Sequence, residues 1–308
     1  MRKSTLYRGD TELLRWEKDD GALQPSEIIL RMAEACRELP VCRAPCPSPA
    51  SPTREQLAFY PVSDLHMGMY VWGRETGKNW DLKIAEEELN DAYDRLLSKT
   101  PPARYAVILG GGDAFHAENN DNETLRGKNK LQVDGRYGKV FDATVRFFVR
   151  RIDAALLQHG RVDVRILPGN HDEHSSTALA YFLAAWYRHE PRVAISTDPS
   201  AFWFYRYGST FLAATHGHKA KAGQLPAIMA ARRPRVWGES IYRYGHSFHL
   251  HRGERLRAEA GGAVVEVHPV AIPNDAWSYG QGFISRRRIS SIIYDPVHGE
   301  DSRFTINM

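Results

Sequence analysis

The chain has 308 residues and is nearly neutral, with 41 Lys plus Arg against 37 Asp plus Glu and a formal charge of +4. Its 43% of apolar and 25% of charged residues are ordinary for a globular protein, which excludes disordered, collagen-like and disulfide-rich classes. No apolar run approaches the roughly 18 residues of a membrane span, and no apolar segment follows the basic start. We therefore expect a cytoplasmic protein without membrane contact.

Residues 1–55 are predicted to form an N-terminal extension. It has a polar start, an amphipathic helix from about Pro25 to Leu39, and the Pro-rich linker RAPCPSPASPT, which cannot sustain a helix or a central strand. The extension is a candidate for homo-oligomerisation. The spacing of its three cysteines fits neither a paired zinc site nor a disulfide framework, so we expect free thiols in a reducing compartment. These are Cys36, Cys42 and Cys46.

Residues 56–308 are predicted to form one α/β domain. Apolar runs at 57–62, 105–110 and 162–167 indicate buried strands, and the helical periodicity of 84–99, 141–159 and 177–189 indicates helices between and after them. Strands at 201–208 and 209–216 precede a looser basic segment at 219–257. The β-rich part at 261–308 then predicts antiparallel strands that close the core.

Polar residues that bind metals recur just after the expected strand ends, where ligands bind in open α/β sheets. Asp64 and His66 are two residues apart, so in an extended chain they would point to the same side and hold one cation. Glycines before Asp113 allow a tight turn and should leave its carboxylate exposed. Asn170 and His171 are adjacent and face different ways, so one can bind metal while the other meets the substrate. Two further places are Thr215-His216-Gly217-His218 and Gly245-His246-Ser247-Phe248-His249-Leu250-His251.

The ligand types in these five places predict a pair of metal ions. Taken singly, each motif is explained as well by a packed or surface side chain, so the prediction depends on all five occurring together. Carboxylates, an amide oxygen and imidazoles without thiolates suit two divalent ions of the Mn, Fe or Zn type rather than a structural zinc cage. Two such ions about 3.5–4 Å apart are the usual apparatus for hydrolysing phosphate esters.

The ordered series DLH, GGD, GNHD, HGH and a late HxH resembles the calcineurin-like metallophosphoesterase superfamily. This resemblance implies an α/β fold, a four-layer αββα sandwich of the metallophosphoesterase type. It also implies two divalent metal ions as cofactors, with Mn²⁺ expected and Fe²⁺, Zn²⁺ or Ni²⁺ as alternatives. His171 would be the catalytic imidazole that protonates or stabilises the leaving oxygen. The implied metal ligands, with Asp113 bridging, are Asp64, His66, Asp113, Asn170, His216, His249 and His251.

The last motif departs from the Gly-His-x-His that is usual in the superfamily. After Gly245 and His246, the next histidine comes three positions on, whereas His249 and His251 have the right spacing but follow Phe248 instead of a glycine. We prefer His249 and His251, because alternation along a strand end puts residues i and i+2 on one face. His246 then becomes a core histidine or one near the site.

Two features concern the substrate. The segment GGDAFHAENN resembles the SbcD-like DNA-repair nuclease branch and phage members, which makes His116 a candidate for orienting the substrate, with a packed supporting histidine as an equal alternative. From Lys219 to Arg257 there are nine Lys or Arg and two Glu, which suits a polyanionic substrate, although a solvated basic face is the usual explanation. We expect His218 and Arg252 to bind the substrate.

We therefore predict a metal-dependent phosphoesterase, a phosphodiesterase or nuclease that acts on DNA or nucleotides. The modest overall charge and the lack of an obvious capping domain weigh against a nuclease, so a phosphomonoesterase on a small substrate is one alternative. A catalytically silent scaffold of the same fold is another. The presence of His171 argues against the scaffold, which has no need of a residue that meets the leaving group.

Overall fold

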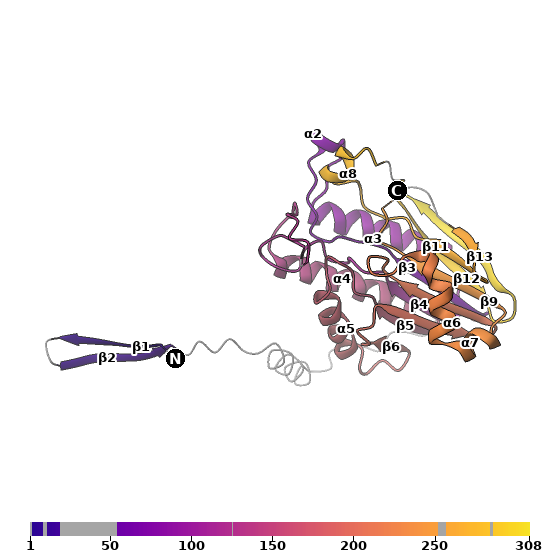
Figure 1. Cartoon of the computed structure of the whole chain (residues 1–308), viewed down its shortest axis with the longest axis horizontal. Helices are drawn as coiled ribbons and strands as arrows, with labels where there is room; N and C mark the ends of the chain where they lie inside the picture. Colours follow the sequence, from indigo (N-terminus) through magenta and orange to yellow (C-terminus); the bar gives the residue numbers. More distant parts are fainter. Residues whose placement is uncertain (1, 9–10, 19–53, 125, 252–256, 284–285) are drawn as a thin grey trace. The chain divides into compact units, whose positions relative to one another are not determined.

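The chain divides into two compact units, Met1–Arg43 and Ala44–Met308. In the first unit, β1 (Arg2–Arg8) and β2 (Thr11–Lys18) form an antiparallel hairpin. The hairpin was not predicted, although Gly9-Asp10 between two strand-like runs is a hairpin signal. The predicted helix, the three cysteines and the Pro-rich linker lie outside the described residues. The computed structural model describes residues 2–8, 11–18, 54–124, 126–251, 257–283 and 286–308 (Figure 1).

A six-stranded sheet in the order β13-β12-β3-β4-β5-β6 forms the centre of the second unit. Strands β3 to β6 run parallel, while β12 is antiparallel to β3 and β13 is antiparallel to β12. The apolar runs LAFYPV and YAVILG fill β3 and β4, as expected for strands that are covered on both faces. Its strands are β3 (Arg54–Val62), β4 (Ala103–Gly110), β5 (Arg161–Ile166), β6 (Val193–Ser196), β12 (Arg288–Asp295) and β13 (Gly299–Asn307).

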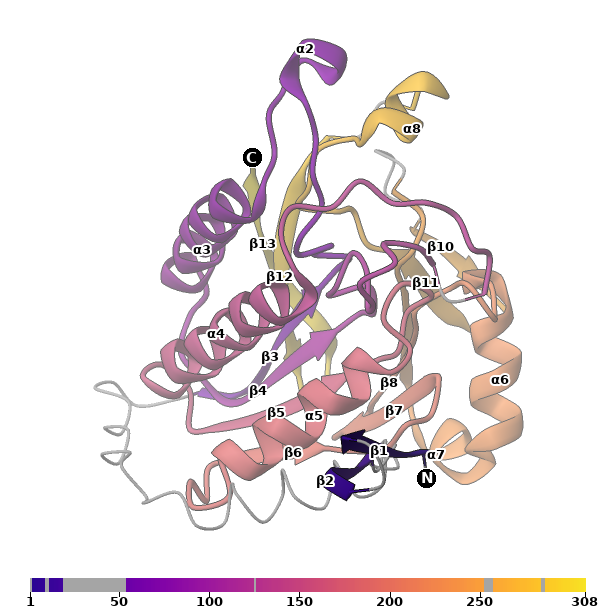
Figure 2. The same ribbon diagram turned by 90° about the vertical axis from the view of Figure 1, so that its left-hand side faces the viewer.

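Helices α3 (Leu82–Lys99), α4 (Tyr137–Leu156) and α5 (Ser175–Trp186) cover one face of this sheet. Their buried faces join a core cluster with residues of β3, β4 and β5 that point to the same side. The side chain of Asp81 caps α3 by accepting from the amide of Ile84, which satisfies one of the free amides of the first turn. The helices thus lie beside the strands whose ends carry the predicted site (Figure 2).

A second sheet of five strands has the order β10-β11-β9-β8-β7. Strand β9 runs parallel to both β8 and β11, while β7 and β10 are antiparallel edge strands. The two sheets are therefore mixed, and both have central parallel strands. The strands are β7 (Phe202–Tyr207), β8 (Thr210–Thr215), β9 (Tyr242–Ser247), β10 (Arg257–Ala260) and β11 (Ala263–Val267).

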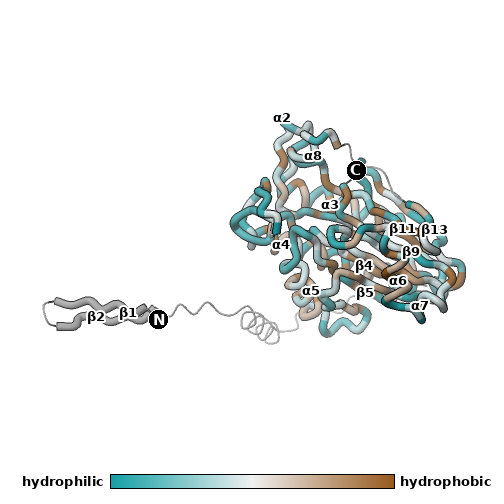
Figure 3. The backbone as a smooth tube through the Cα atoms, viewed as in Figure 1, coloured by the Kyte–Doolittle hydropathy of each residue, from teal (hydrophilic) through white to brown (hydrophobic). Residues whose placement is uncertain are grey.

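The two sheets share an apolar core. Phe59 and Leu109 of the first sheet cluster with Leu212 and Tyr244 of the second. On the other side of the second sheet, Phe211 and Ala213 of β8 pack on Met229 of α6 (Leu225–Arg232), with α7 (Pro234–Glu239) beside it. Apolar residues therefore run through the strands, whereas many of the connecting loops are hydrophilic (Figure 3).

The α/β class and the strands and helices predicted between residues 56 and 216 are confirmed, but the basic segment was assigned wrongly as loose. It holds α6, α7 and the central strand β9, in which three of the four buried positions are Gly245, His246 and Ser247 and only Tyr244 is apolar. That composition hides the strand from a search for apolar periodicity. The C-terminal β-rich part is also split, because β11 joins the second sheet and β12 and β13 the first.

Across the described segments, no helix is both long enough and apolar enough to cross a membrane.

Candidate metal centre

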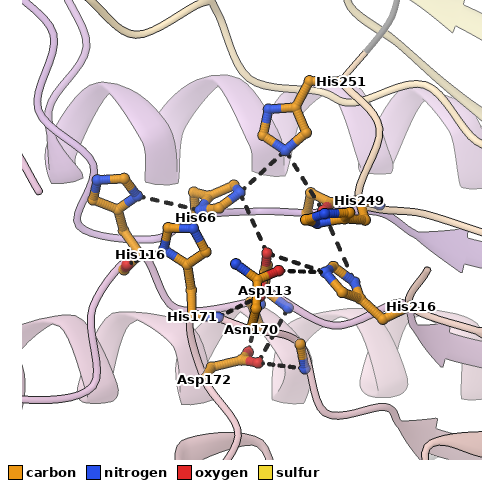
Figure 4. Close-up of polar contacts among 12 residues, drawn as sticks. His66, Asp113, His116, Asn170, His171, Asp172, His216, His249 and His251 are labelled. Atoms are coloured by element: carbon orange, nitrogen blue, oxygen red, sulfur yellow. Dashed lines mark hydrogen bonds and ion pairs between the residues drawn. The ribbon is translucent and has the colours of Figure 1, made fainter. Parts of the chain in front are cut away.

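Five loops meet at one edge of the two sheets. They follow the C-terminal ends of β3, β4 and β5 in the first sheet and of β8 and β9 in the second. Because these strands are parallel within each sheet, their ends lie together, and the predicted ligands come within reach of one another. The residues that the structure brings together are Asp64, His66, Asp113, His116, Asn170, His171, His216, His249 and His251 (Figure 4).

The backbone at this edge is strained. Among the described residues, six non-glycine residues have positive φ, and four of them are predicted metal ligands: Asp64 (31°), His66 (41°), Asp113 (51°) and His249 (70°). Such conformations are costly for residues with a Cβ and persist mainly at functional sites. The expectation that Asp64 and His66 share a side because the chain is extended is wrong, since β3 ends at Val62; the left-handed turns bring them together.

Two glycines of the motifs allow close approach between the loops. A Cβ on Gly169 would lie 2.0 Å from Oδ1 of Asp113, and one on Gly112, which has a φ of +97°, would lie 2.6 Å from Nδ1 of His216. Glycine is therefore required at both positions for packing, and at Gly112 for the turn as well. The Asp113 carboxylate is buried rather than exposed as predicted, because these loops close around it.

Asp64, His66 and His251 form the first potential ligand group. Nε2 of His66 is 3.2 Å from Nε2 of His251, and Oδ1 of Asp64 is 3.5 Å from that same nitrogen of His251. Oδ2 of Asp64 accepts from the Ser63 hydroxyl and the His249 amide, whereas the buried Oδ1 has no hydrogen-bond partner among the described residues. A buried oxygen left in this way is what a cation would satisfy.

Asp113, His216 and His249 form the second group, and Asn170 adjoins it. Nε2 of His216 is 3.1 Å from Oδ2 of Asp113 and 3.2 Å from Oδ1 of Asn170. The same Oδ2 of Asp113 is 3.9 Å from Nε2 of His66, so Asp113 lies between the two groups. Ligands about 2.1 Å from one ion are themselves about 3–3.5 Å apart, which matches these separations.

The electrostatics of the cluster favour cations. Although burial opposes it, the charge of Asp113 raises the pKa of His216 to about 10, and Asp64 likewise raises the pKa of His251. Burial also disfavours the ionised form of Asp113, yet the charge of and hydrogen bond from His216 hold the pKa of Asp113 well below its usual range. Buried carboxylates thus draw protons onto the imidazoles, and a metal ion would compete with these protons for the same nitrogens.

His216 and His171 are each fixed by a backbone carbonyl. Nδ1 of His216 donates to the carbonyl of Gly111 at 2.8 Å, which leaves Nε2 as the ligand atom. Nδ1 of His171 donates to the carbonyl of His116 at 2.7 Å, and the His171 amide donates to Oδ1 of Asp113 at 2.8 Å. With its Nδ1 engaged, His171 has Nε2 available to a bound molecule.

His116 is buried behind His66. Its Nδ1 is 3.2 Å from Nδ1 of His66, so the two rings share one hydrogen bond, and Nε2 of His66 is left for the metal side. Burial lowers the pKa of His116 to about 3, which keeps the ring neutral. This geometry fits the supporting alternative of the sequence analysis better than a direct part in orienting substrate, because metal-binding histidines are oriented by such partners.

Asp172 is a functional residue that the sequence analysis missed. Its buried carboxylate accepts hydrogen bonds from the backbone amides of Asp113, Ala114, Phe115 and Gly169 and so ties the loop after β4 to the loop after β5. Burial and the nearby charge of Asp113 raise its pKa to about 7, against the effect of the amides. The signal was available, since Asp172 directly follows Asn170-His171 in GNHD.

Replacement of Asp172 by asparagine is expected to lower the free energy of unfolding by about 3 kcal/mol. The NH₂ group of asparagine is a donor that would face the backbone amides, which are donors too. At least one of these buried amides would then lose its acceptor. Denaturant unfolding measures the change, with Asp198→Asn as control, because the exposed Asp198 accepts from the Ser200 amide and asparagine keeps that acceptor. Equal stabilities for the two variants would contradict the tying role.

His249 and His251, rather than His246, belong to the cluster. Strand β9 ends at Ser247, and His249 has positive φ, so the predicted pair is not on a strand. The prediction that His249 and His251 share the site agrees with their positions. The reason given for it, alternation along a strand, was wrong. The turn after β9 brings the backbone amide of His249 to 3.2 Å from Asp64.

His246 lies within a separate buried network between the sheets. Its Nδ1 is 2.9 Å from Nε2 of His268, and its Nε2 is 3.2 Å from the hydroxyl of Tyr294. Glu266 lies near enough to complete a three-residue group, but both of its carboxylate oxygens are bonded to Arg303 at 2.8 Å. The guanidinium of Arg303 therefore compensates the charge of Glu266 in this network.

The described Lys and Arg of the basic segment do not line the site, although His249 and His251 of the same segment do. Arg232 and Arg233 stack over Phe202 and Phe204 on the outer face of the second sheet, with 5.2 and 4.9 Å from guanidinium to ring. None of the described Lys or Arg of this segment lines the cavity over the cluster. His218 does line it, whereas Arg252 lies outside the described residues. Arg232, Arg233 and Arg243 pack on aromatic rings, and Lys219, Arg235 and Arg257 pair with glutamates. Local packing and surface ion pairs therefore account for most of the described basic residues of the segment.

A cavity of about 920 Å³ opens above the cluster. His66, Asp113, Asn170 and His171 are at its base. One wall is the loop that contains Arg126 and Lys130, and Arg126 is held by Glu173 at 3.0 Å. The opposite wall consists of residues 272–283, with Ile272, Pro273, Trp277 and Phe283 among the lining residues. The cavity is large enough for a ligand well beyond a phosphate group.

The chain matches no model of a known protein family, and no curated protein matches it either.

Proposed function

We propose that this protein is a metal-dependent phosphoesterase with a dinuclear centre, of the calcineurin-like metallophosphoesterase type. The observation that carries the proposal is the pair of ligand groups with Asp113 between them: Asp64, His66 and His251 on one side, and Asn170, His216 and His249 on the other. The orphaned Oδ1 of Asp64 and the facing imidazole nitrogens fit a pair of divalent cations. The packing of helices on two face-to-face sheets supports the four-layer αββα sandwich as part of this proposal.

Mn²⁺ is our proposed metal, with Fe²⁺, Zn²⁺ or Ni²⁺ as alternatives, because the ligands are imidazole, carboxylate and amide oxygen without a thiolate. Bound there, the ions would activate a water molecule and neutralise charge on the phosphoryl oxygens. The chain supplies the geometry: Asp172 holds the loops of Asp113 and Asn170 together, and His116 orients His66.

His171 is the proposed general acid. It lines the cavity at the edge of both ligand groups, and the hydrogen bond from Nδ1 to the His116 carbonyl fixes its ring. When the ring is protonated, Nε2–H can deliver its proton to the leaving oxygen while Nδ1–H stays on the carbonyl. A proton transfer of this kind contributes about 10²–10⁴ in rate.

We further propose a phosphodiester rather than a monoester as substrate. The cavity extends beyond the metal centre, which leaves room for a second group on the phosphate. The test is hydrolysis of bis-p-nitrophenyl phosphate, p-nitrophenyl phosphate and single-stranded DNA by the full chain, loaded in turn with Mn²⁺, Fe²⁺, Zn²⁺ and Ni²⁺. Turnover of the two diesters supports the proposal. Turnover of the monoester alone would replace it with a phosphomonoesterase, and no turnover with any of the four metals would favour a silent scaffold.

Removal of His251 is expected to release metal, whereas removal of His246 is not. His251→Ala should lose at least half of the bound metal, because His251 lies in the first ligand group. His246→Ala should retain the metal but lose about 3 kcal/mol of stability, because Tyr294 and His268 lose a buried partner. Elemental analysis and denaturant unfolding separate the two effects. Metal loss in His246→Ala with none in His251→Ala would overturn the ligand assignment.

A further inference from the structure

Exposed aromatic side chains gather beside the cavity. Seven of the aromatic side chains in the described residues are exposed. Five of them belong to two segments, 70–72 and 277–283. The indole of Trp277 is 65% exposed and Phe283 is 40% exposed, although both line the cavity. We name the five residues the aromatic ridge: Tyr70, Trp72, Trp277, Tyr279 and Phe283.

The two segments of the ridge are adjacent. Trp72 caps α2 (Gly73–Thr76), and Trp277 and Tyr279 lie on α8 (Ala276–Gly280). The two short helices contact each other and lie side by side in both views (Figures 1 and 2). Large apolar groups concentrated on one exposed area mark binding sites more often than scattered ones do.

The part of the ridge next to the metal centre is held in place. The rings of Trp277 and Phe283 meet edge to face with centroids 5.8 Å apart. Asp275 caps α8 by accepting from the amide of Ser278, and the amide of Phe283 donates to the Ser278 carbonyl at 3.1 Å. The exposed face of Trp277 is therefore preset rather than free to collapse, as suits a stacking platform.

The arrangement combines three features that nucleic acid requires. The metal centre at the base of the cavity suits a phosphodiester, flat aromatic faces line the wall beside it, and basic side chains lie on one wall and near the ridge. Arg126 and Lys130 line the cavity and pair with Glu173 and Glu123. Arg74 lies 5.9 Å from the ring of Trp72, and Arg286 is exposed. Aromatic platforms next to a cationic track are how proteins bind single strands, because every base has a face that can stack.

We propose that the aromatic ridge binds the bases of a single-stranded nucleic acid whose backbone enters the metal centre. This inference deepens the proposed phosphodiesterase function and rests on it for the position of the scissile phosphate. A single strand is favoured over a duplex, because paired bases do not present their faces to a protein surface. The ridge also extends beyond the cavity to Trp72, which is farther than one nucleotide needs.

The test measures binding and hydrolysis separately. Binding of fluorescein-labelled dT12 and U12 to the full chain is followed by anisotropy in EDTA, where no hydrolysis occurs, and a duplex of the same length is compared. Trp277→Ala is expected to raise the Kd for the single strands about tenfold, the loss of about one stacked base. Trp277→Phe should remain within threefold of the wild type, because the ring that stacks is kept.

Trp186→Ala is the matched control. Trp186 is also exposed, at 46%, but it stacks on Phe182 of α5 and lies outside the ridge. It should leave the Kd unchanged. Hydrolysis of bis-p-nitrophenyl phosphate by Mn²⁺-loaded Trp186→Ala should also equal that of the wild type, since Trp186 does not line the cavity.

The outcomes distinguish the two proposals. Single-strand binding that depends on Trp277 supports the ridge even where no diester is hydrolysed, in which case the phosphodiesterase proposal fails alone. The ridge proposal is overturned if the wild type hydrolyses diesters but binds neither oligonucleotide, or if Trp277→Ala binds them with the Kd of the wild type. The phosphodiesterase proposal then stands alone. Equal or tighter binding of the duplex overturns the assignment to single strands.

Discussion

Replacement of Asp113 by alanine is expected to abolish metal binding at both groups and to reduce diester hydrolysis at least 10³-fold. Oδ2 of Asp113 is 3.1 Å from His216 and 3.9 Å from His66, so one carboxylate serves both sides. Its removal leaves the buried imidazoles without the charge that favours a cation there. Elemental analysis should find about two metal ions per wild-type chain and fewer than one in the variant.

Asp91→Ala is the control for this experiment. Asp91 lies on α3 with its side chain 66% exposed and pairs with Arg95 at the surface, so its removal should change neither metal content nor rate. A variant at Asp113 that keeps two metal ions would contradict the bridging position. If Asp113→Ala keeps two metal ions but loses activity, Asp113 acts in a step other than metal binding.

Replacement of His171 by alanine is expected to lower the rate about 10²–10⁴-fold while the metal content stays at two ions per chain. The side chain of His171 is held by the His116 carbonyl and not by either ligand group, so its loss removes a proton donor without removing a ligand. The loss should be larger for an alkyl leaving group than for p-nitrophenol, which needs little help from an acid.

His189→Ala serves as the matched histidine variant, because His189 is exposed after α5 and outside the cavity lining. Its rate should equal that of the wild type. Metal loss in His171→Ala equal to that in Asp113→Ala would show that His171 is a ligand, and equal rate losses for good and poor leaving groups would remove it as the general acid.

Much of the candidate site could be predicted because its residues follow apolar strands directly. The strands at β3, β4, β5 and β8 have clear apolar runs, and the polar loops after them stand out in the sequence. Strand β9 has no such run, so the position of His249 and His251 relative to a strand could not be predicted. The argument from strand alternation was also wrong for Asp64, His66 and His249. These residues have positive φ, so they are not in an extended chain.

Other features of the proposed site depend on partners that are remote in the sequence. Asp172 is defined by amides 57 to 59 residues away, and the aromatic ridge joins segments about 200 residues apart. The charge excess at 219–257 was misleading for the same reason, since Arg232 and Arg233 pack on aromatic residues of β7. A one-dimensional count cannot say which charges face a cavity and which cover a sheet.

The sequence by itself determined the α/β alternation and the chemical types of the residues after each strand, because both depend on local periodicity and on neighbours in the chain. Only the tertiary structure decided which of the histidines share a site. Parallel strands from two sheets end at one edge, so His66 and His251, 185 residues apart, approach to 3.2 Å, while His246 is turned into a different network. That difference depends on strand register and on left-handed turns, which are selected by packing between the sheets.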